Sequence, residues 1–104
     1  MYCISIQIRP KYSQAFDQQA FLSRVRRIRS PEIDAEEEKG KLFLSFNFFT
    51  EFPKALWEDL ANALYKDPEY GELISEQSLA ICEDDAGDCL LLHHYDVSEK
   101  LDSL

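Results

Sequence analysis

Polar and apolar residues alternate strictly at the start of the chain. The apolar positions between residues 2 and 9 are Tyr2, Ile4, Ile6 and Ile8. A period of two is typical of a strand with one buried face. We therefore predict a strand over residues 2–9 whose isoleucines enter the core.

The spacing of apolar residues changes after Pro10 and a short polar stretch. Asp17 is a good N-cap, with Phe16 before it and Phe21 four residues after it, as in a hydrophobic staple. A helix is expected to begin at Asp17 and to stop at Ser30-Pro31. Its apolar side consists of Phe21, Leu22, Val25 and Ile28.

An acidic segment, Glu32 to Glu38, follows. It is compatible with a helical turn or with an edge strand. The turn signal Lys39-Gly40 and the apolar, aromatic run from Leu42 to Phe49 favour an edge strand paired with a central strand. The charges would then protect the exposed edge against pairing with other chains.

The second half begins with a break at residues 50–53 and a helix. Its inner side is predicted to contain Leu56, Leu60, Ala63 and Leu64, with Tyr65 pointing away. Asp67-Pro68 is expected to start a short helix. Ser78–Glu83 and Asp88–Tyr95 read as a hairpin closed by residues 84–87. The last eight residues are expected to be frayed.

These elements predict the fold class. The order strand, helix, strand, strand, helix, short helix, strand, strand indicates an α+β protein whose antiparallel or mixed sheet has helices packed on one face. It matches a ferredoxin-like arrangement with an additional C-terminal strand. A length of 104 residues suits a single domain, residues 1–104.

Charge narrows the choice of partners. The formal net charge is -9, with +5 over residues 1–30 and -14 over residues 31–104. Direct binding of nucleic-acid phosphates is therefore disfavoured. No run of about eighteen apolar residues and no basic-then-apolar leader is present, so we expect a cytoplasmic protein without a membrane partner.

Few residues suggest chemistry. Cys82 and Cys89 could face each other across the last hairpin, but together with Cys3 they lack the spacing of a metal site. We expect reduced, metal-free cysteines and no cofactor. His93 and His94 fall on opposite sides of a strand, and either would need a neighbouring carboxylate for catalysis. With no nucleophile, phosphate-loop or dinucleotide motif, we do not expect an enzyme.

Basic residues are concentrated near the end of the first helix. They are Arg24, Arg26, Arg27 and Arg29. Positive charge is favoured there by the helix dipole. We expect these arginines to pair with Glu36–Glu38; the alternative is a patch that binds RNA or phosphate.

The best functional lead is the acidity of the C-terminal third. Eleven acids and one base, Lys100, lie between Asp67 and Asp102. One interpretation is a solubilising surface. The other is a surface that binds a basic protein, with the tyrosine as a less solvated anchor. The candidate residues are Glu69, Tyr70, Glu72, Glu76, Glu83, Asp84, Asp85 and Asp88.

In size, acidity and layout, the chain resembles the small bacterial immunity proteins of contact-dependent growth inhibition and related toxin systems. The resemblance implies a cytoplasmic inhibitor that binds one cognate toxin domain, often a basic nuclease, and occludes its active site or substrate path. An alternative is a small-molecule-binding or regulatory domain that uses the sheet face around Phe43, Ser45, Asn47 and Phe49. A less favoured one is a small enzyme using His93 or His94.

Overall fold

The computed structural model describes residues 1–104. The chain contains five strands and four helices. In order they are β1 (Tyr2–Ile8), α1 (Pro10–Ser13), α2 (Gln18–Val25), β2 (Glu32–Glu38), β3 (Lys41–Thr50), α3 (Pro53–Ala63), α4 (Gly71–Gln77), β4 (Ser78–Glu83) and β5 (Cys89–His93). None of the helices has the length and apolar character needed to cross a membrane.

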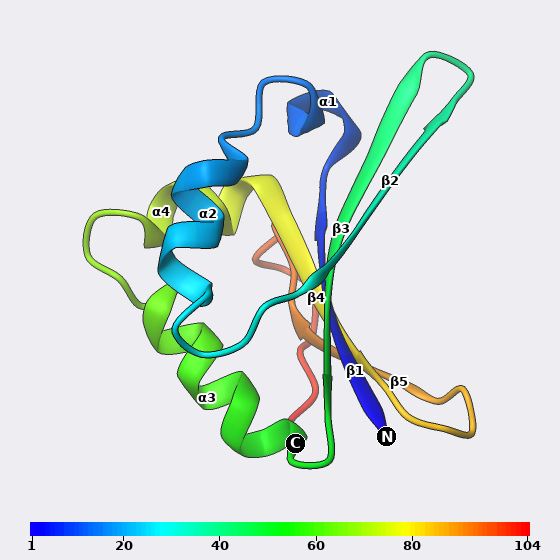
Figure 1. Cartoon of the computed structure of the whole chain (residues 1–104), viewed down its shortest axis with the longest axis vertical. Helices are drawn as coiled ribbons and strands as arrows, with labels where there is room; N and C mark the ends of the chain where they lie inside the picture. Colours follow the sequence, from blue (N-terminus) through cyan, green and yellow to red (C-terminus); the bar gives the residue numbers. More distant parts are fainter.

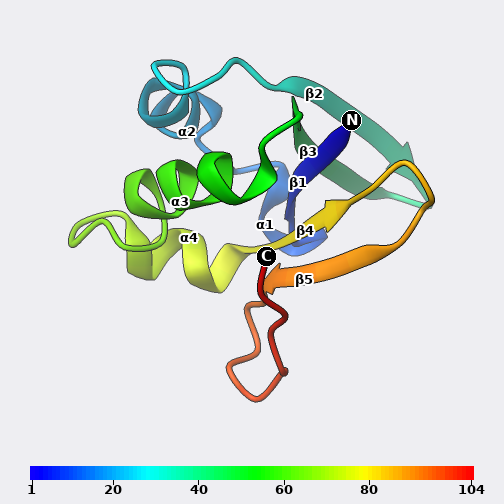
Figure 2. The ribbon, with the colours of Figure 1, turned by 90° about the horizontal axis from the view of Figure 1, so that it is seen from below.

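The five strands form one sheet in the order β2-β3-β1-β4-β5, and every neighbouring pair is antiparallel. Helices α2, α3 and α4 pack on one face, while α1 lies at one end of the sheet (Figures 1 and 2). The prediction of an α+β protein with helices on one face of its sheet is confirmed. We call the uncovered side of the sheet the open face.

Strand β1 lies in the middle of the sheet and shows why the sequence alternates. Ile4 and Ile6 are fully buried under the helices, and Ile8 is 3% exposed. The residues between them, such as Ser5 and Gln7, point to the open face because successive side chains of a strand alternate. The predicted buried face is therefore confirmed.

The first long helix begins as predicted. The Asp17 carboxylate accepts a hydrogen bond from the backbone N–H of Ala20 at 3.0 Å, which caps α2. The rings of Phe16 and Phe21 lie 5.9 Å apart, centroid to centroid. Phe21 also lies 4.3 Å from Phe46 of β3, so the helix packs directly on the sheet.

The edge-strand prediction for the acidic segment is also confirmed. Lys39 and Gly40 have positive φ angles, 51° and 78°, as expected for the tight turn of a hairpin. All seven residues of β2 are exposed, and the β2–β3 hairpin projects beyond the helices (Figure 1).

After α3, one prediction is wrong and one is correct only in part. Tyr65 points inward: its hydroxyl lies 2.7 Å from the buried Ser78 Oγ. The helix ends at Ala63, so its periodicity no longer sets the direction of Tyr65. The short helix begins at Gly71 and not at Asp67. Asp67 nevertheless caps the preceding turn as predicted: its carboxylate accepts from the backbone N–H groups of residues 69 and 70, both at 2.8 Å, and its carbonyl accepts from that of Gly71.

The chain after β5 is not frayed as predicted. The backbone N–H of Leu91 donates to the Asp102 carboxylate, and the backbone N–H of Asp102 donates to the Leu91 carbonyl, both at 2.8 Å. Leu104 packs against the core. The C-terminal segment thus covers the outer edge of β5 at Leu91.

Candidate functional site

The structure divides the acidic cluster predicted from the sequence into two groups. One group lies on and just before α4, and the other lies at the turn between β4 and β5. The intervening strand β4 has six residues, which at about 3.3 Å per residue separates the groups by roughly 20 Å. Figures 1 and 2 show α4 and this turn at opposite ends of the molecule. They do not form one patch.

Tyr70 is not the exposed anchor that the sequence suggested. It is only 7% exposed and belongs to the core. The Arg24 guanidinium carbon lies 4.3 Å from the centre of its ring, and the guanidinium pairs with Asp67 at 3.0 Å. The turn held by Asp67 directs the tyrosine inward, under Arg24.

The predicted pairing between the arginines of α2 and Glu36–Glu38 is wrong. Arg24 pairs with Asp67, and Arg29 donates a hydrogen bond to the Phe49 carbonyl. This contact places the end of the helix beside the last residues of β3. Glu36–Glu38 pair with residues 41–43 at the opposite end of that strand, out of reach.

Two acids of the β4–β5 turn already have partners within the chain. Asp84 accepts from the backbone N–H groups of Ala86 and Asp88 at 2.9 and 3.0 Å, which closes the turn. Asp85 accepts from the amino group of Met1 at 2.6 Å. These contacts give both side chains a local structural role.

The cysteines do not face one another. Cys82 pairs with Leu90 and Glu83 pairs with Cys89, so the two thiols lie on opposite faces of the sheet. The pKa values of Cys3, Cys82 and Cys89 are all raised, first by desolvation and then by nearby acids. Fewer thiolates form as a result, and the thiolate is the reactive and metal-binding form.

Neither histidine has the carboxylate partner that acid–base catalysis would favour. His93 Nε2 lies 3.0 Å from the Ser75 carbonyl oxygen, and its ring stacks on Tyr65 with centroids 4.1 Å apart. His94 Nδ1 accepts from the backbone N–H of Asp96 at 3.0 Å. The surroundings of His93 are those of a packed structural side chain.

Desolvation lowers the pKa of the half-buried His93 below its ordinary value of 6.5. The unfolded chain therefore binds a proton that the folded chain resists, so stability is fully present above about pH 6.5 and falls as the pH drops towards the folded pKa. We expect His93→Gln to flatten this part of the pH dependence in urea unfolding. The variant His94→Gln removes only the smaller electrostatic contribution of His94 to the lowered pKa of His93, so it should flatten the slope less than His93→Gln; equal flattening by both variants would contradict the assignment.

The open face gathers residues that the sequence treated separately. The β2–β3 register places four acids of β2 on this side, opposite residues of β3. The pairs are Glu32 with Asn47, Asp34 with Ser45, Glu36 with Phe43, and Glu38 with Lys41. Phe43 and Phe49 are 44% and 41% exposed there. A row of carboxylates thus runs beside two accessible aromatic rings.

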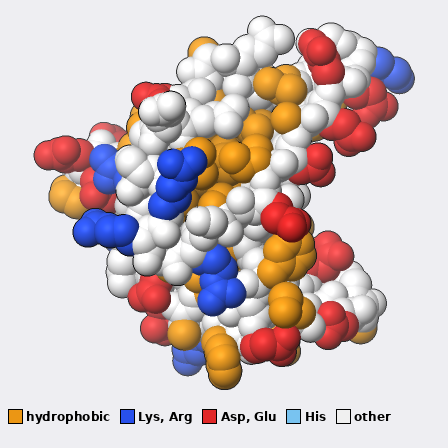
Figure 3. Space-filling view, in the orientation of Figure 1, with side chains coloured by type: hydrophobic (Ala, Val, Ile, Leu, Met, Phe, Trp, Pro, Cys, Tyr) orange, Lys and Arg blue, Asp and Glu red, His pale blue; other side chains and the backbone are white.

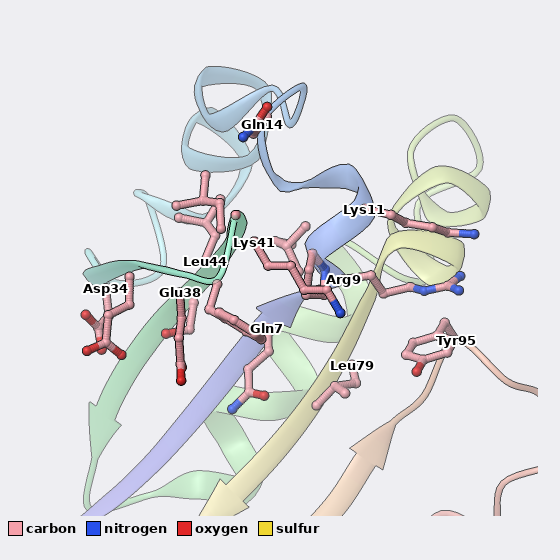
Figure 4. A pocket seen from close by; sticks show the side chains of 17 residues that line it. Gln7, Arg9, Lys11, Gln14, Asp34, Glu38, Lys41, Leu44, Leu79 and Tyr95 are labelled. Atoms are coloured by element: carbon pink, nitrogen blue, oxygen red, sulfur yellow. The ribbon is translucent and has the colours of Figure 1, made fainter.

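A groove of about 980 Å³ crosses the open face at the end near α1. Figure 4 shows Asp34 and Glu38 along one side of it, Gln7 between the walls, and Arg9 and Tyr95 towards the other side. The Arg9 guanidinium carbon is 3.9 Å from the centre of the Tyr95 ring, and Arg9 donates to the Glu76 carbonyl at 3.1 Å. The side of the groove that contains Arg9 is therefore held in place by the contacts of Arg9 with Tyr95 and Glu76.

No ion pair within the chain involves the carboxylates of β2, although Lys41 lies opposite Glu38 in the register. The ion pairs of the protein join Met1 to Glu51 and Asp85, and Arg24 to Asp67. All five acids of β2 lack one. Figure 3 shows acidic side chains gathered along the β2–β3 hairpin beside an apolar strip. This row is available to a positively charged partner.

Sequence reasoning interpreted these acids only as protection of an edge and as partners for arginines. The alternation of acids at every second residue of β2 was the available signal that four of them share one side. Comparisons with protein-family models, curated proteins and solved structures find no match to the chain. The function of the open face is therefore inferred from its geometry and charge.

Proposed function

We propose that this chain is an immunity protein that binds and neutralises a cognate toxin domain, with the open face as its binding surface. The observation that carries the proposal is the row of unpaired acids on β2 beside Phe43 and Phe49. Complementary charge accelerates encounter and fixes orientation, and aromatic side chains supply the desolvated contacts.

A basic nuclease is the toxin class that fits this surface best. Its substrate path must attract phosphates and is therefore rich in lysine and arginine. Acids on one side of a strand follow each other at about 7 Å. A row of this kind would engage several cationic groups at once and keep the nucleic acid out.

The groove supports a second candidate, a small-molecule-binding or regulatory domain. Its volume of about 980 Å³ is within the range of ligand sites. However, charged side chains line much of it, which suits a protein surface better than an apolar ligand. They are the acids Asp34, Glu36 and Glu38 of β2 and the bases Arg9, Lys11 and Lys41. An enzyme using His93 or His94 has less support, because no carboxylate orients either ring.

For the fold, we propose the narrower description of a ferredoxin-like arrangement with an additional C-terminal strand. The support is the order β2-β3-β1-β4 together with two crossovers, from β1 past β3 to β2 and from β3 past β1 to β4. Strand β5 is the addition. Such folds host many activities, so this description does not select a function.

The double variant Asp34→Lys/Glu36→Lys tests the binding surface. Its affinity for the toxic domain encoded by the neighbouring gene should fall at least about tenfold, or about 1.4 kcal/mol. The dependence of affinity on salt should also become weaker, because fewer charge pairs form. Titration calorimetry at low and moderate salt measures both, after circular dichroism has shown that the variant is folded.

Two matched variants test whether the loss of affinity is specific to β2. Glu69→Lys/Glu72→Lys around the start of α4 and Asp85→Lys/Asp88→Lys in the β4–β5 turn introduce the same charge change outside the strands of the sheet. Both should bind nearly as tightly as the wild type. If the turn variant loses affinity and the β2 variant does not, the turn is the interface and the open face is not. If the wild type neither binds the domain nor protects cells from it, the inhibitor function is wrong.

A further inference from the structure

The two edges of the sheet are not equivalent. The edge formed by β5 is covered at Leu91, where Asp102 supplies both a donor and an acceptor. Strand β2 pairs only with β3, so its outer edge has no backbone partner. The β2–β3 hairpin also stands clear of the helices (Figure 1). A free edge of this kind is a template for an added strand.

The two sides of β2 differ in chemistry. On the open face the strand presents four acids. On the other side it presents Ile33, which is 47% exposed, Ala35 and Glu37. A strand added next to β2 would therefore meet carboxylates at every second position and mainly small or apolar side chains at the positions between. Directly opposite side chains in such a pair lie about 5 Å apart.

A second copy of the chain does not fit this edge. Two β2 strands placed side by side would oppose five acids with five acids, and like charges across strands are destabilising. The edge calls for a partner strand of opposite charge.

We propose that β2 accepts an extended basic segment of the toxin as a sixth strand. Lysine or arginine side chains of the segment lie over the acid row, and its small apolar side chains lie over Ile33 and Ala35. Main-chain hydrogen bonds supply affinity, and the alternating side chains fix the register, because a slip by one residue would exchange the two sides. This inference rests on the proposed function and adds how the partner is held.

The test uses a blocked peptide of about ten residues that alternates lysine with valine, long enough to span β2. Hydrogen exchange followed by NMR should show slower exchange at alternate amides within Glu32–Glu38 when the peptide is bound. A control peptide with proline in place of several valines keeps the charge but loses backbone donors. It should bind at least about tenfold more weakly.

Three results separate the possibilities. Equal binding of both peptides without protection of β2 would mean attraction by charge alone and would overturn strand addition. Protection confined to other strands would also overturn it. Failure of the peptide test while the toxic domain still binds through Asp34 and Glu36 would remove strand addition and leave the proposed function intact; failure of the domain to bind would remove the proposed function itself.

Discussion

Phe46→Ala should lower the free energy of unfolding by about 3–5 kcal/mol. The Phe46 side chain is fully buried, and its ring lies 4.3 Å from Phe21 and 5.9 Å from Phe16, centroid to centroid. Truncation removes apolar surface burial and leaves a cavity that a rigid strand and a capped helix cannot close. Urea unfolding monitored by circular dichroism, with the wild-type denaturant dependence retained, measures the loss.

Phe43→Ala is the matched control, since it removes the same ring from the same strand. Phe43 lies on the open face and is 44% exposed, so its loss should approach the roughly 0.5 kcal/mol of surface substitutions. Leu44→Ala and Leu60→Ala, both in the core, should each cost about 2–5 kcal/mol. A cost below about 0.5 kcal/mol for Phe46→Ala would contradict the assignment of the two faces of β3.

Gly71→Ala should also destabilise the protein, by about 1–3 kcal/mol or more. A Cβ atom at this position would lie 2.4 Å from the Tyr65 carbonyl oxygen and 3.1 Å from its carbon. These are backbone atoms, so α4 or the segment after α3 would have to move. Such a shift would strain the hydrogen bond between Tyr65 and Ser78. Thermal and urea unfolding would show the loss.

The direction of this change is informative because alanine is ordinarily the better helix former by about 1 kcal/mol. The adjacent substitution Glu72→Ala, at an exposed position of the same helix, should leave stability nearly unchanged. Equal or greater stability of Gly71→Ala would show that the close approach between α4 and Tyr65 is incorrect.

The features predicted correctly from the sequence are those encoded by neighbouring residues. The alternation of β1, the Asp17 cap with its phenylalanine staple, and the Lys39-Gly40 turn each depend on a few consecutive positions. These features result from the direction of neighbouring side chains and from local hydrogen bonds, which involve only residues a few positions apart. Hence the strands were predicted with small errors at their ends. Helix α2 ends at Val25, well before the predicted stop at Ser30, and helix α1 was not predicted.

The predictions fail where contacts between residues far apart in the sequence determine the direction of a side chain. Tyr65 and Tyr70 follow the end of a helix, and Ser78 and Arg24, from other elements, fix their directions. The last hairpin has a loop of residues 84–88, one residue longer than predicted, which pairs Glu83 with Cys89. The one additional loop residue places Cys89 on the face of the sheet opposite to Cys82.

The sheet face around Phe43 and Phe49 was among the alternatives predicted from the sequence, but the contribution of the β2 acids to this surface was missed for a related reason. Acids that are close along the chain do not form one surface, because strand β4 separates the acids near α4 from those at the β4–β5 turn. The acids of β2 gain their significance from the neighbouring strand β3, which places Phe43 beside Glu36. Only the register between strands shows which side chains share a surface.

The C-terminal segment sets how many partners the sheet can recruit through its edges. Because Asp102 occupies both backbone groups of Leu91, a strand added at β5 would first have to displace the C-terminal segment. The proposed strand addition at β2 meets no such competitor, so it would extend the sheet at one edge. Two free edges would make each molecule divalent, and head-to-tail addition of that kind produces open-ended filaments unless it closes into a ring. A molecule with one free edge forms a finite complex, which is the stoichiometry that an inhibitor of a single partner requires.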